Sequence, residues 1–152
     1  MRYGNTPFLV AEYFLFLADN ERRPLSPMQI LKLVYIAHGW MLGLHNRPLV
    51  NEPIEAWQYG PVIRSLYQRY KKYGSRPVDD GPAQRPSGFE DDERRTMEQV
   101  WSGYGQWSAV SLSALTHETG SPWDITVKES GMGSVIPNDL IEDHYRRLAH
   151  NR

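Results

Sequence analysis

The chain has no cysteine, and this absence removes several classes of function. None of its 152 residues can form a disulfide, a cysteine metal site or a thiol nucleophile. Long apolar runs are missing too, since no stretch approaches the ~20 residues that a membrane span needs. The N-terminal stretch also lacks the pattern of a signal peptide. We therefore expect a soluble, cytoplasmic protein without thiol redox chemistry.

A strong charge of one sign is also lacking, because the formal net charge is -1. Residues 1–75 carry 9 Lys and Arg against 5 Asp and Glu, giving +4, whereas residues 76–152 carry 8 against 13, giving -5. Arg64, Arg69, Lys71 and Lys72 fall on one predicted helix and can contact phosphate, but a solvated helix face explains them more simply. Nucleic-acid binding is therefore not supported by the charge.

The most apolar part of the sequence follows Ser26 and predicts a long, buried helix. Ser26 and Gln29 have the spacing of a capping box, and Pro27 occupies the first helical position. Apolar residues then surround nearly the whole helix, which is typical of a central core element. Gly39 and Gly43 share one strip, where they allow another backbone to approach closely. We expect this helix to end near Gly43.

The remaining patterns predict a mainly α, compact single-domain helical bundle over residues 1–152. A first helix is expected from Pro7 to just before Asn20, and a small two-stranded β-hairpin from Leu49–Val50 and Ile54–Tyr59. Further helices are expected from Gly60-Pro61 to about Tyr73, from Asp91, after Ser108 and from Pro137. Residues 75–90 are expected to form a flexible excursion, and residues 125–135 to be weakly structured.

Groups with catalytic potential are few. His38 is expected to be a hydrogen-bonded core histidine, because it lies within the buried helix. Thr116, His117 and Glu118 place a hydroxyl, an imidazole and a carboxylate close together in sequence, which is compatible with a hydrolase-type enzyme. A structural role is the stronger interpretation: Gly120 allows a reversal, and Pro122 fixes the approach of Trp123, which anchors a loop.

Sites for metals and cofactors are not apparent. No histidine has the spacing of a HExxH motif, and the irregular Gly131-Met-Gly133 is weak support for nucleotide binding. Trp40, Trp57, Tyr59 and Tyr67 are better explained as core and groove wall than as a cofactor cage. We therefore predict no cofactor and no bound metal.

Several distinctive motifs follow one another along the chain. They are Pro27-Met-Gln-Ile-Leu-Lys-Leu-Val-Tyr-Ile-Ala-His-Gly-Trp40, Pro48-Leu49, Glu55-Ala-Trp-Gln-Tyr-Gly-Pro-Val62, Leu115-Thr-His117 and Ser121-Pro-Trp123. Together they resemble the Panacea domain, the family of the SocA-like antitoxins and the phage-associated GepA proteins. The resemblance spans most of the chain and implies one Panacea-like domain over residues 1–152. The motif positions are His38, Gly39, Trp40, Gly60, Pro61, Thr116, His117, Ser121, Pro122 and Trp123.

The resemblance implies an antitoxin of a bacterial or phage toxin–antitoxin system. Such a protein neutralises a cognate protein toxin, encoded by an adjacent gene, by direct binding or as an adaptor that delivers it to a Clp protease. We expect the partner to contact six residues, namely Lys32, Tyr35, Trp57, Tyr59, Arg64 and Tyr67. Three alternatives stay open: a hydrolase using His117, a phage or host interaction module without a toxin, and a homodimer formed through an aromatic patch.

Overall fold

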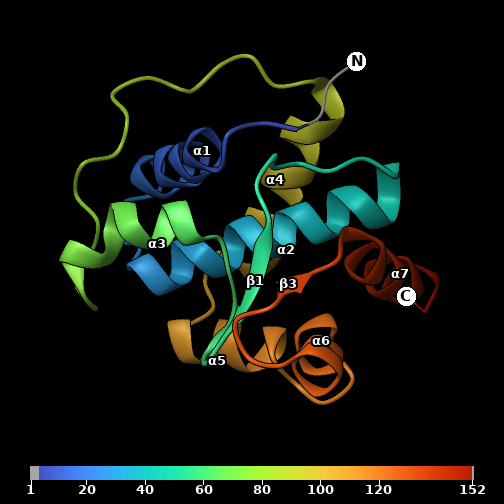
Figure 1. The fold of residues 1–152 in the computed structure, drawn as a ribbon. Coiled ribbons are helices and arrows are strands. Elements are labelled where there is room, and N and C mark those ends of the chain that lie inside the picture. The colour runs from blue at the N-terminus through green and yellow to red at the C-terminus, as the bar shows by residue number, and fades with distance from the viewer. Residues whose placement is uncertain (1–3, 152) are drawn as a thin grey trace.

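The computed structural model describes residues 4–151, in which six α-helices and a small sheet surround one long helix, α2 (Figure 1). The helices are α1 (Pro7–Asn20), α2 (Pro27–His45), α3 (Arg64–Tyr70), α4 (Asp91–Tyr104), α5 (Ala109–Thr116), α6 (Pro122–Ser130) and α7 (Asn138–His150), with a 3-10 turn η1 (Lys71–Tyr73). The strands are β1 (Ile54–Trp57), β2 (Gly60–Val62) and β3 (Val135–Ile136). The predicted mainly α fold is confirmed.

Helix α2 forms the centre of the fold, as its sequence predicts. Ser26 accepts a hydrogen bond from the Gln29 amide, and the Gln29 side chain accepts one from the Ser26 amide, which completes the capping box. Every residue from Ile30 to Leu42 is buried. Asn46, in the left-handed conformation with φ 60°, ends the helix three residues after Gly43.

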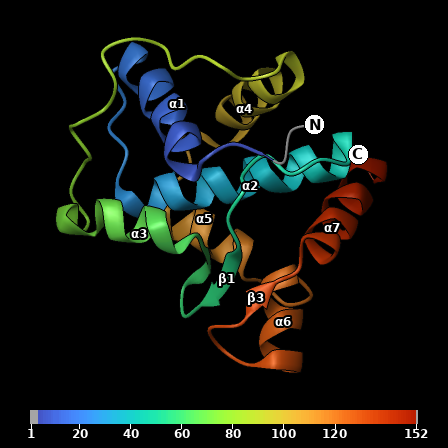
Figure 2. The same ribbon diagram turned by 45° about the horizontal axis from the view of Figure 1, so that its top comes forward.

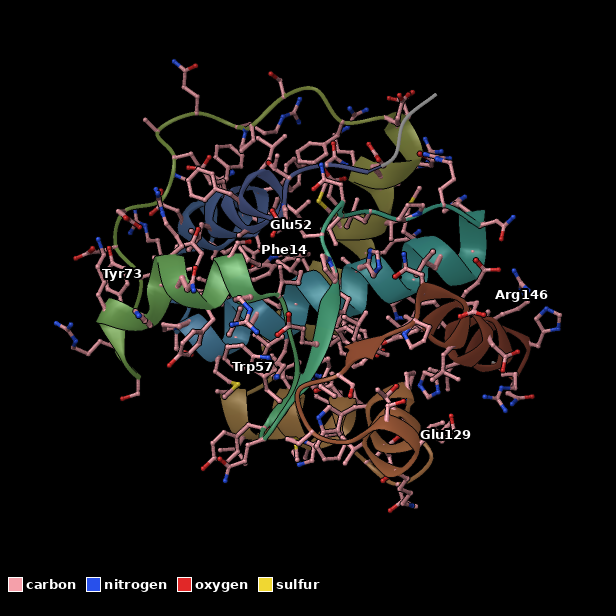
Figure 3. All side chains as sticks on the ribbon, in the orientation of Figure 1. Phe14, Glu52, Trp57, Tyr73, Glu129 and Arg146 are labelled. Atoms are coloured by element: carbon pink, nitrogen blue, oxygen red, sulfur yellow. The ribbon has the colours of Figure 1, made fainter. Side chains whose placement is uncertain are left out.

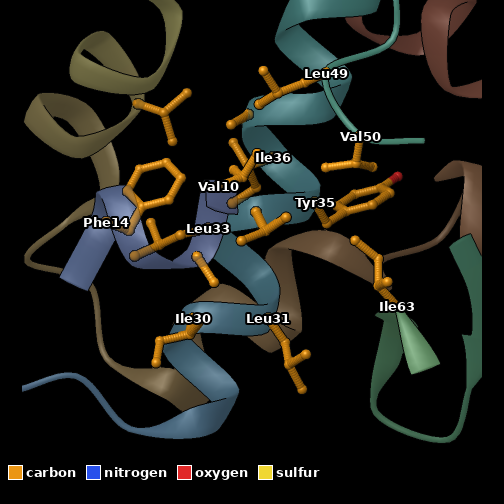
Figure 4. Packing of buried hydrophobic residues seen from close by; sticks show 14 of the residues in the cluster. Val10, Phe14, Ile30, Leu31, Leu33, Tyr35, Ile36, Leu49, Val50 and Ile63 are labelled. Atoms are coloured by element: carbon orange, nitrogen blue, oxygen red, sulfur yellow. The ribbon is translucent and has the colours of Figure 1, made fainter. Parts of the chain in front are cut away.

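Other helices cover α2 on opposite sides. Figure 2 shows α1 and α4 on one side and α5 on the other, with α7 crossing near the C-terminal end of α2. Figure 4 shows Val10 and Phe14 of α1 packed against Ile30, Leu33 and Ile36 of α2, all fully buried. Burial of such side chains contributes about 1.5–3 kcal/mol each, so this cluster is a main source of stability.

The two glycines of α2 allow the close approach that the sequence predicts. A Cβ atom at Gly39 would lie on the ring of Tyr145, and one at Gly43 would lie 2.9 Å from the backbone nitrogen of Arg146. Helix α7 therefore packs directly against the α2 backbone. The Tyr145 ring meets Trp40 edge-on, with ring centroids 5.1 Å apart.

The predicted hairpin exists, but its strands were assigned wrongly. β1 pairs antiparallel with β2, with Trp57 opposite Gly60, whereas Val50 forms an isolated bridge with Asn5. Gly60 has φ +117°, a conformation that favours glycine, so the chain reverses there. Pro61 is tolerated because β2 is an edge strand of the sheet. The helix expected from Gly60 therefore begins at Arg64.

Two further expectations on the second half of the chain need correction. Residues 125–135 are not weakly structured, because Ser121 accepts a hydrogen bond from the Asp124 amide and starts α6 with Pro122 at its first position. β3 then adds to β1 and makes a three-stranded sheet in the order β2-β1-β3. The two-stranded hairpin is thus only part of this sheet.

The segment between η1 and α4 has no helix or strand and passes over α1 (Figure 1). Val78 anchors it, because its side chain is buried and its amide donates to the Leu25 carbonyl at 2.8 Å. Phe89 lies edge-on against Tyr13, with ring centroids 5.3 Å apart. These contacts fix the path of the segment over α1.

Candidate protein-binding groove

A groove of about 220 Å³ opens where the start of α2, the β1–β2 hairpin and α3 meet. Its lining comes from these three regions and from η1 with the residue after it: Pro27, Met28, Leu31, Lys32, Trp57, Tyr59, Val62, Tyr67, Lys71 and Gly74. A larger hollow of about 570 Å³ lies between α2 and α4, beside Trp40 and Trp107. That hollow contains none of the residues predicted to contact a partner, so the smaller groove is the better candidate site.

Aromatic side chains form the outer wall of the groove. Trp57 and Tyr67 meet edge-on with ring centroids 5.0 Å apart, and Figure 3 shows Trp57 beside the hairpin, next to α3. Tyr59 at the hairpin turn is 60% exposed and Tyr67 is 40% exposed. Large aromatic rings that are partly exposed and held rigidly are typical of residues that dominate protein interfaces.

Glu55 fixes the polar side of this wall. Its carboxylate accepts hydrogen bonds from the Trp57 indole at 2.8 Å and from the Arg64 guanidinium at 2.9 Å. The indole hydrogen bond and then the Arg64 guanidinium hold the pKa of Glu55 below its usual value. Arg64 also lies over the Trp57 ring, 5.7 Å from its centroid. The indole and the guanidinium are therefore held in place before any partner binds.

Lys32 lies beneath the groove. Its side chain is fully buried, and Nζ donates a hydrogen bond to the Pro61 carbonyl at 2.9 Å. Burial lowers the pKa of Lys32 to about 7, because removal from water disfavours the charged ammonium. A Cβ atom at Gly60 would lie 3.0 Å from Nζ and 3.2 Å from the Thr116 hydroxyl. Gly60 therefore leaves the room in which Lys32 reaches β2.

Helices α5 and α6 hold the hairpin from its other side. The Ser113 hydroxyl donates to the Tyr59 carbonyl at 2.6 Å, and the Trp123 indole donates to the Trp57 carbonyl at 2.6 Å. The His117 ring packs edge-on against Trp123, with ring centroids 5.3 Å apart. These contacts support the backbone at both aromatic residues of the hairpin turn. Sequence reasoning missed Ser113, although it lies one turn before His117 on the same helix face.

Four of the six residues predicted to contact a partner lie at the groove surface: Trp57, Tyr59, Arg64 and Tyr67. The other two do not, since Lys32 is 0% and Tyr35 only 1% exposed. The Tyr35 ring packs toward Tyr145, and burial raises the pKa of its hydroxyl. The prediction of a direct contact at Lys32 and Tyr35 is therefore wrong for this conformation, because both side chains point into the interior.

Comparison with known proteins identifies the family. The family model described as "Antitoxin SocA-like, Panacea domain" matches residues 30–124, which include every part of the groove except the first turn of α2. This chain belongs to the SocA-like antitoxin family. Antitoxin SocA of Caulobacter vibrioides (strain NA1000 / CB15N) is 31% identical over 137 residues, covering 81% of this chain and 73% of that protein. No solved structure matches the chain.

The Panacea motif residues of α2 hold the interior of this SocA-like protein together. His38 is fully buried; its Nε2 lies 2.9 Å from the Asn138 side-chain oxygen, and its Nδ1 lies 3.2 Å from the Leu49 amide nitrogen. Burial lowers the pKa of His38 to about 4, so the ring is neutral near pH 7 and Nδ1 accepts from the amide. The prediction of a hydrogen-bonded core histidine is confirmed.

The Panacea motif around His117 does not form the arrangement that a threonine nucleophile would need. The buried Thr116 hydroxyl donates to the carbonyls of Leu112 and Ser113, at 3.0 and 3.1 Å. His117 Nδ1 instead lies 3.4 Å from the Ser113 hydroxyl, while Glu118 is exposed. Thr116 therefore bonds within its own helix, while His117 packs on Trp123.

Within residues 4–151, no group of three His, Asp or Glu side chains is arranged to hold a metal ion. None of the helices in the same part of the chain combines the length and the apolar character needed to cross a membrane.

Proposed function

We propose that this protein is an antitoxin that binds a cognate protein toxin in the cytoplasm, through the groove at the β1–β2 hairpin. The observation that carries the proposal is the convergence of Trp57, Tyr59, Arg64 and Tyr67 on one surface. Membership of the SocA-like family supports a toxin as the partner. Tyr59 and Tyr67 are the outermost of the aromatic groups, so they would make the largest contact with a toxin.

The rigidity of the groove also favours binding to another protein. Lys32, Ser113 and Trp123 bond to three backbone carbonyls of the hairpin, and Glu55 fixes Trp57 and Arg64. A surface that is ordered before binding loses little conformational entropy on association. The groove therefore supports recognition by direct contact. This contact would serve either to mask the toxin or to present it to a Clp protease.

Removing both exposed tyrosines is expected to abolish neutralisation. The double variant Tyr59→Ala/Tyr67→Ala should weaken toxin binding by about 1,000-fold, because aromatic anchors at interface centres commonly contribute about 2 kcal/mol each, which is about 30-fold per residue. Trp107→Ala is a matched control, since Trp107 is a comparably exposed aromatic (38%) that lines the other hollow. Binding is measured by titration with the purified product of the neighbouring gene, and neutralisation by growth on co-expression.

The outcomes separate the parts of the proposal. If the neighbouring gene product is harmless alone, or stays toxic and unbound beside the wild-type protein, the antitoxin function is refuted. If the double variant neutralises as well as the wild type, the toxin contacts another surface. The half-life of the toxin in cells with and without Clp protease distinguishes the two modes, because masking leaves it unchanged whereas delivery shortens it only when the protease is present.

A further inference from the structure

The groove combines an apolar hollow with basic side chains that have few acidic neighbours. Helix α3 and η1, residues 64–73, contain Arg64, Arg69, Lys71 and Lys72 and no acidic residue. Lys71 lines the groove and is exposed, Arg64 borders it over Trp57, and the buried Lys32 lies below. Basic charge therefore surrounds a hollow whose walls include Met28, Leu31 and Val62.

The acidic groups of this region do not line the groove. Glu55 is the acidic residue of the hairpin, and both of its oxygens already bond to Arg64 while one also bonds to Trp57. Asp79 and Asp80 lie near the Tyr73 hydroxyl, outside the groove lining; burial first, and then these carboxylates, raise the pKa of Tyr73 to about 12. Among the described residues, Lys71 forms no ion pair, while Arg69 lies over the Phe8 ring of α1. Lys71 thus carries the free charge at the groove.

We propose that the groove binds an acidic segment of the toxin, with one large apolar side chain in the hollow and carboxylates beside Lys71 and Arg64. This inference rests on the proposed function and specifies the chemistry of its partner. A hollow of about 220 Å³ has room for one apolar side chain, and charge complementarity sets the sign of the residues that flank it. Burial lowers the pKa of Lys32 to about 7, so this side chain is only partly charged at neutral pH and Lys71 supplies most of the free positive charge.

A nucleic acid is the other partner that aromatic and basic groups can bind, but the observations favour a peptide. Polyanion binding needs basic charge along an extended track, since affinity grows with the number of phosphates neutralised. Here the basic groups are confined to residues 64–73 and the groove floor, whereas residues 76–152 carry a net charge of -5, from 8 basic and 13 acidic residues. A short acidic segment needs only the local charge.

Fluorescence anisotropy with the full chain tests the inference. The probe is a fluorescein-labelled peptide with a central Phe flanked by two Glu on each side, set between Gly-Ser spacers. Matched peptides carry Lys in place of Glu, or Ala in place of Phe, and a 12-nucleotide oligo(dT) represents nucleic acid. The acidic Phe peptide is expected to bind about ten-fold tighter than either matched peptide at low salt, and to weaken as salt screens the charges.

Charge reversal locates the binding site. Lys71→Glu should weaken the acidic Phe peptide about five-fold, whereas Arg147→Glu on α7, with the same change in net charge, should not. No binding of the acidic peptide, equal binding of the lysine peptide, tighter binding of oligo(dT), or equal effects of the two variants would each overturn the inference.

The cognate toxin separates this inference from the proposed function. Lys71→Glu should weaken toxin binding at least as much as it weakens the peptide, because the toxin contributes the same acidic segment within a larger interface. A toxin that binds Lys71→Glu and wild type equally well refutes the acidic segment but leaves the antitoxin function standing. A toxin that the wild-type protein does not bind at all refutes the proposed function itself.

Discussion

Replacing Gly43 with alanine is expected to lower the free energy of unfolding by about 3 kcal/mol, at the upper end of the usual range for an overpacked core. The added Cβ would lie 2.7 Å from the Tyr145 Cβ and 2.9 Å from the Arg146 backbone nitrogen. A side chain can rotate away from such a contact, but here the backbone of α7 must move. That shift would also disturb the Tyr145 ring, which packs between Trp40 and Tyr35.

Urea unfolding of the wild type and of Gly43→Ala measures this difference. Gly103→Ala is the matched control, because Gly103 is an exposed residue of α4 with nothing within 4 Å of the added atom. Alanine is the better helix former, so the control should be more stable than the wild type by about 0.5–1 kcal/mol. A loss below 1 kcal/mol in Gly43→Ala would mean that α7 does not pack directly on the α2 backbone.

Local signals in the sequence were sufficient to predict the helices of the core. Capping residues act within one turn, so Ser26 with Gln29 located the start of α2, and Ser108 located the start of α5. The glycine strip of α2 also predicted a close neighbour without identifying α7 as that neighbour. Most features determined by residues three or four positions apart were therefore predicted correctly; α6 is the exception, because its Ser121 cap and Pro122 were assigned to a loop.

Features that depend on residues far apart in the sequence were not predicted correctly. β3 has only two residues and exists because Ile54 and Glu55 pair with it across about 80 positions of sequence. The start of α3 was misplaced for a related reason. Gly60-Pro61 has the local pattern of a helix start, and only its pairing with β1 shows that it forms a strand. Pairing partners of this kind leave no periodic pattern in either segment.

The aromatic wall of the groove was predictable from the sequence, but its apolar lining and its depth were not. Trp57, Tyr59, Arg64 and Tyr67 were all identified from the sequence, and the fold brings them together. Lys32 and Tyr35 were assigned to the same surface, although both are buried. Because α2 is apolar on nearly every side, its periodicity did not indicate which way a polar side chain faces. Only the packing of the hairpin and α7 decides this.

The free energy of unfolding of the wild type, taken relative to that of Lys32→Met, is expected to rise by about 4 kcal/mol between pH 6 and pH 10. The pKa of Lys32 is about 7 in the folded protein and 10.5 in an exposed lysine, which represents the unfolded chain. Below pH 7 the ammonium is charged in both states. From pH 7 to 10.5 the unfolded chain keeps the proton that the folded protein has released, so the wild type gains about 1.4 kcal/mol per pH unit relative to the methionine variant.

Urea unfolding of both proteins at pH 6 and pH 10 checks this result, because other groups titrate equally in the two chains and cancel in the difference. Lys32→Gln is the matched control: it is neutral at both pH values and keeps a donor for the Pro61 carbonyl. The difference in the free energy of unfolding between Lys32→Gln and Lys32→Met should therefore stay constant with pH. A constant difference between the wild type and Lys32→Met would show that burial does not lower the pKa of Lys32, and the charge beneath the groove would then be fully present at neutral pH.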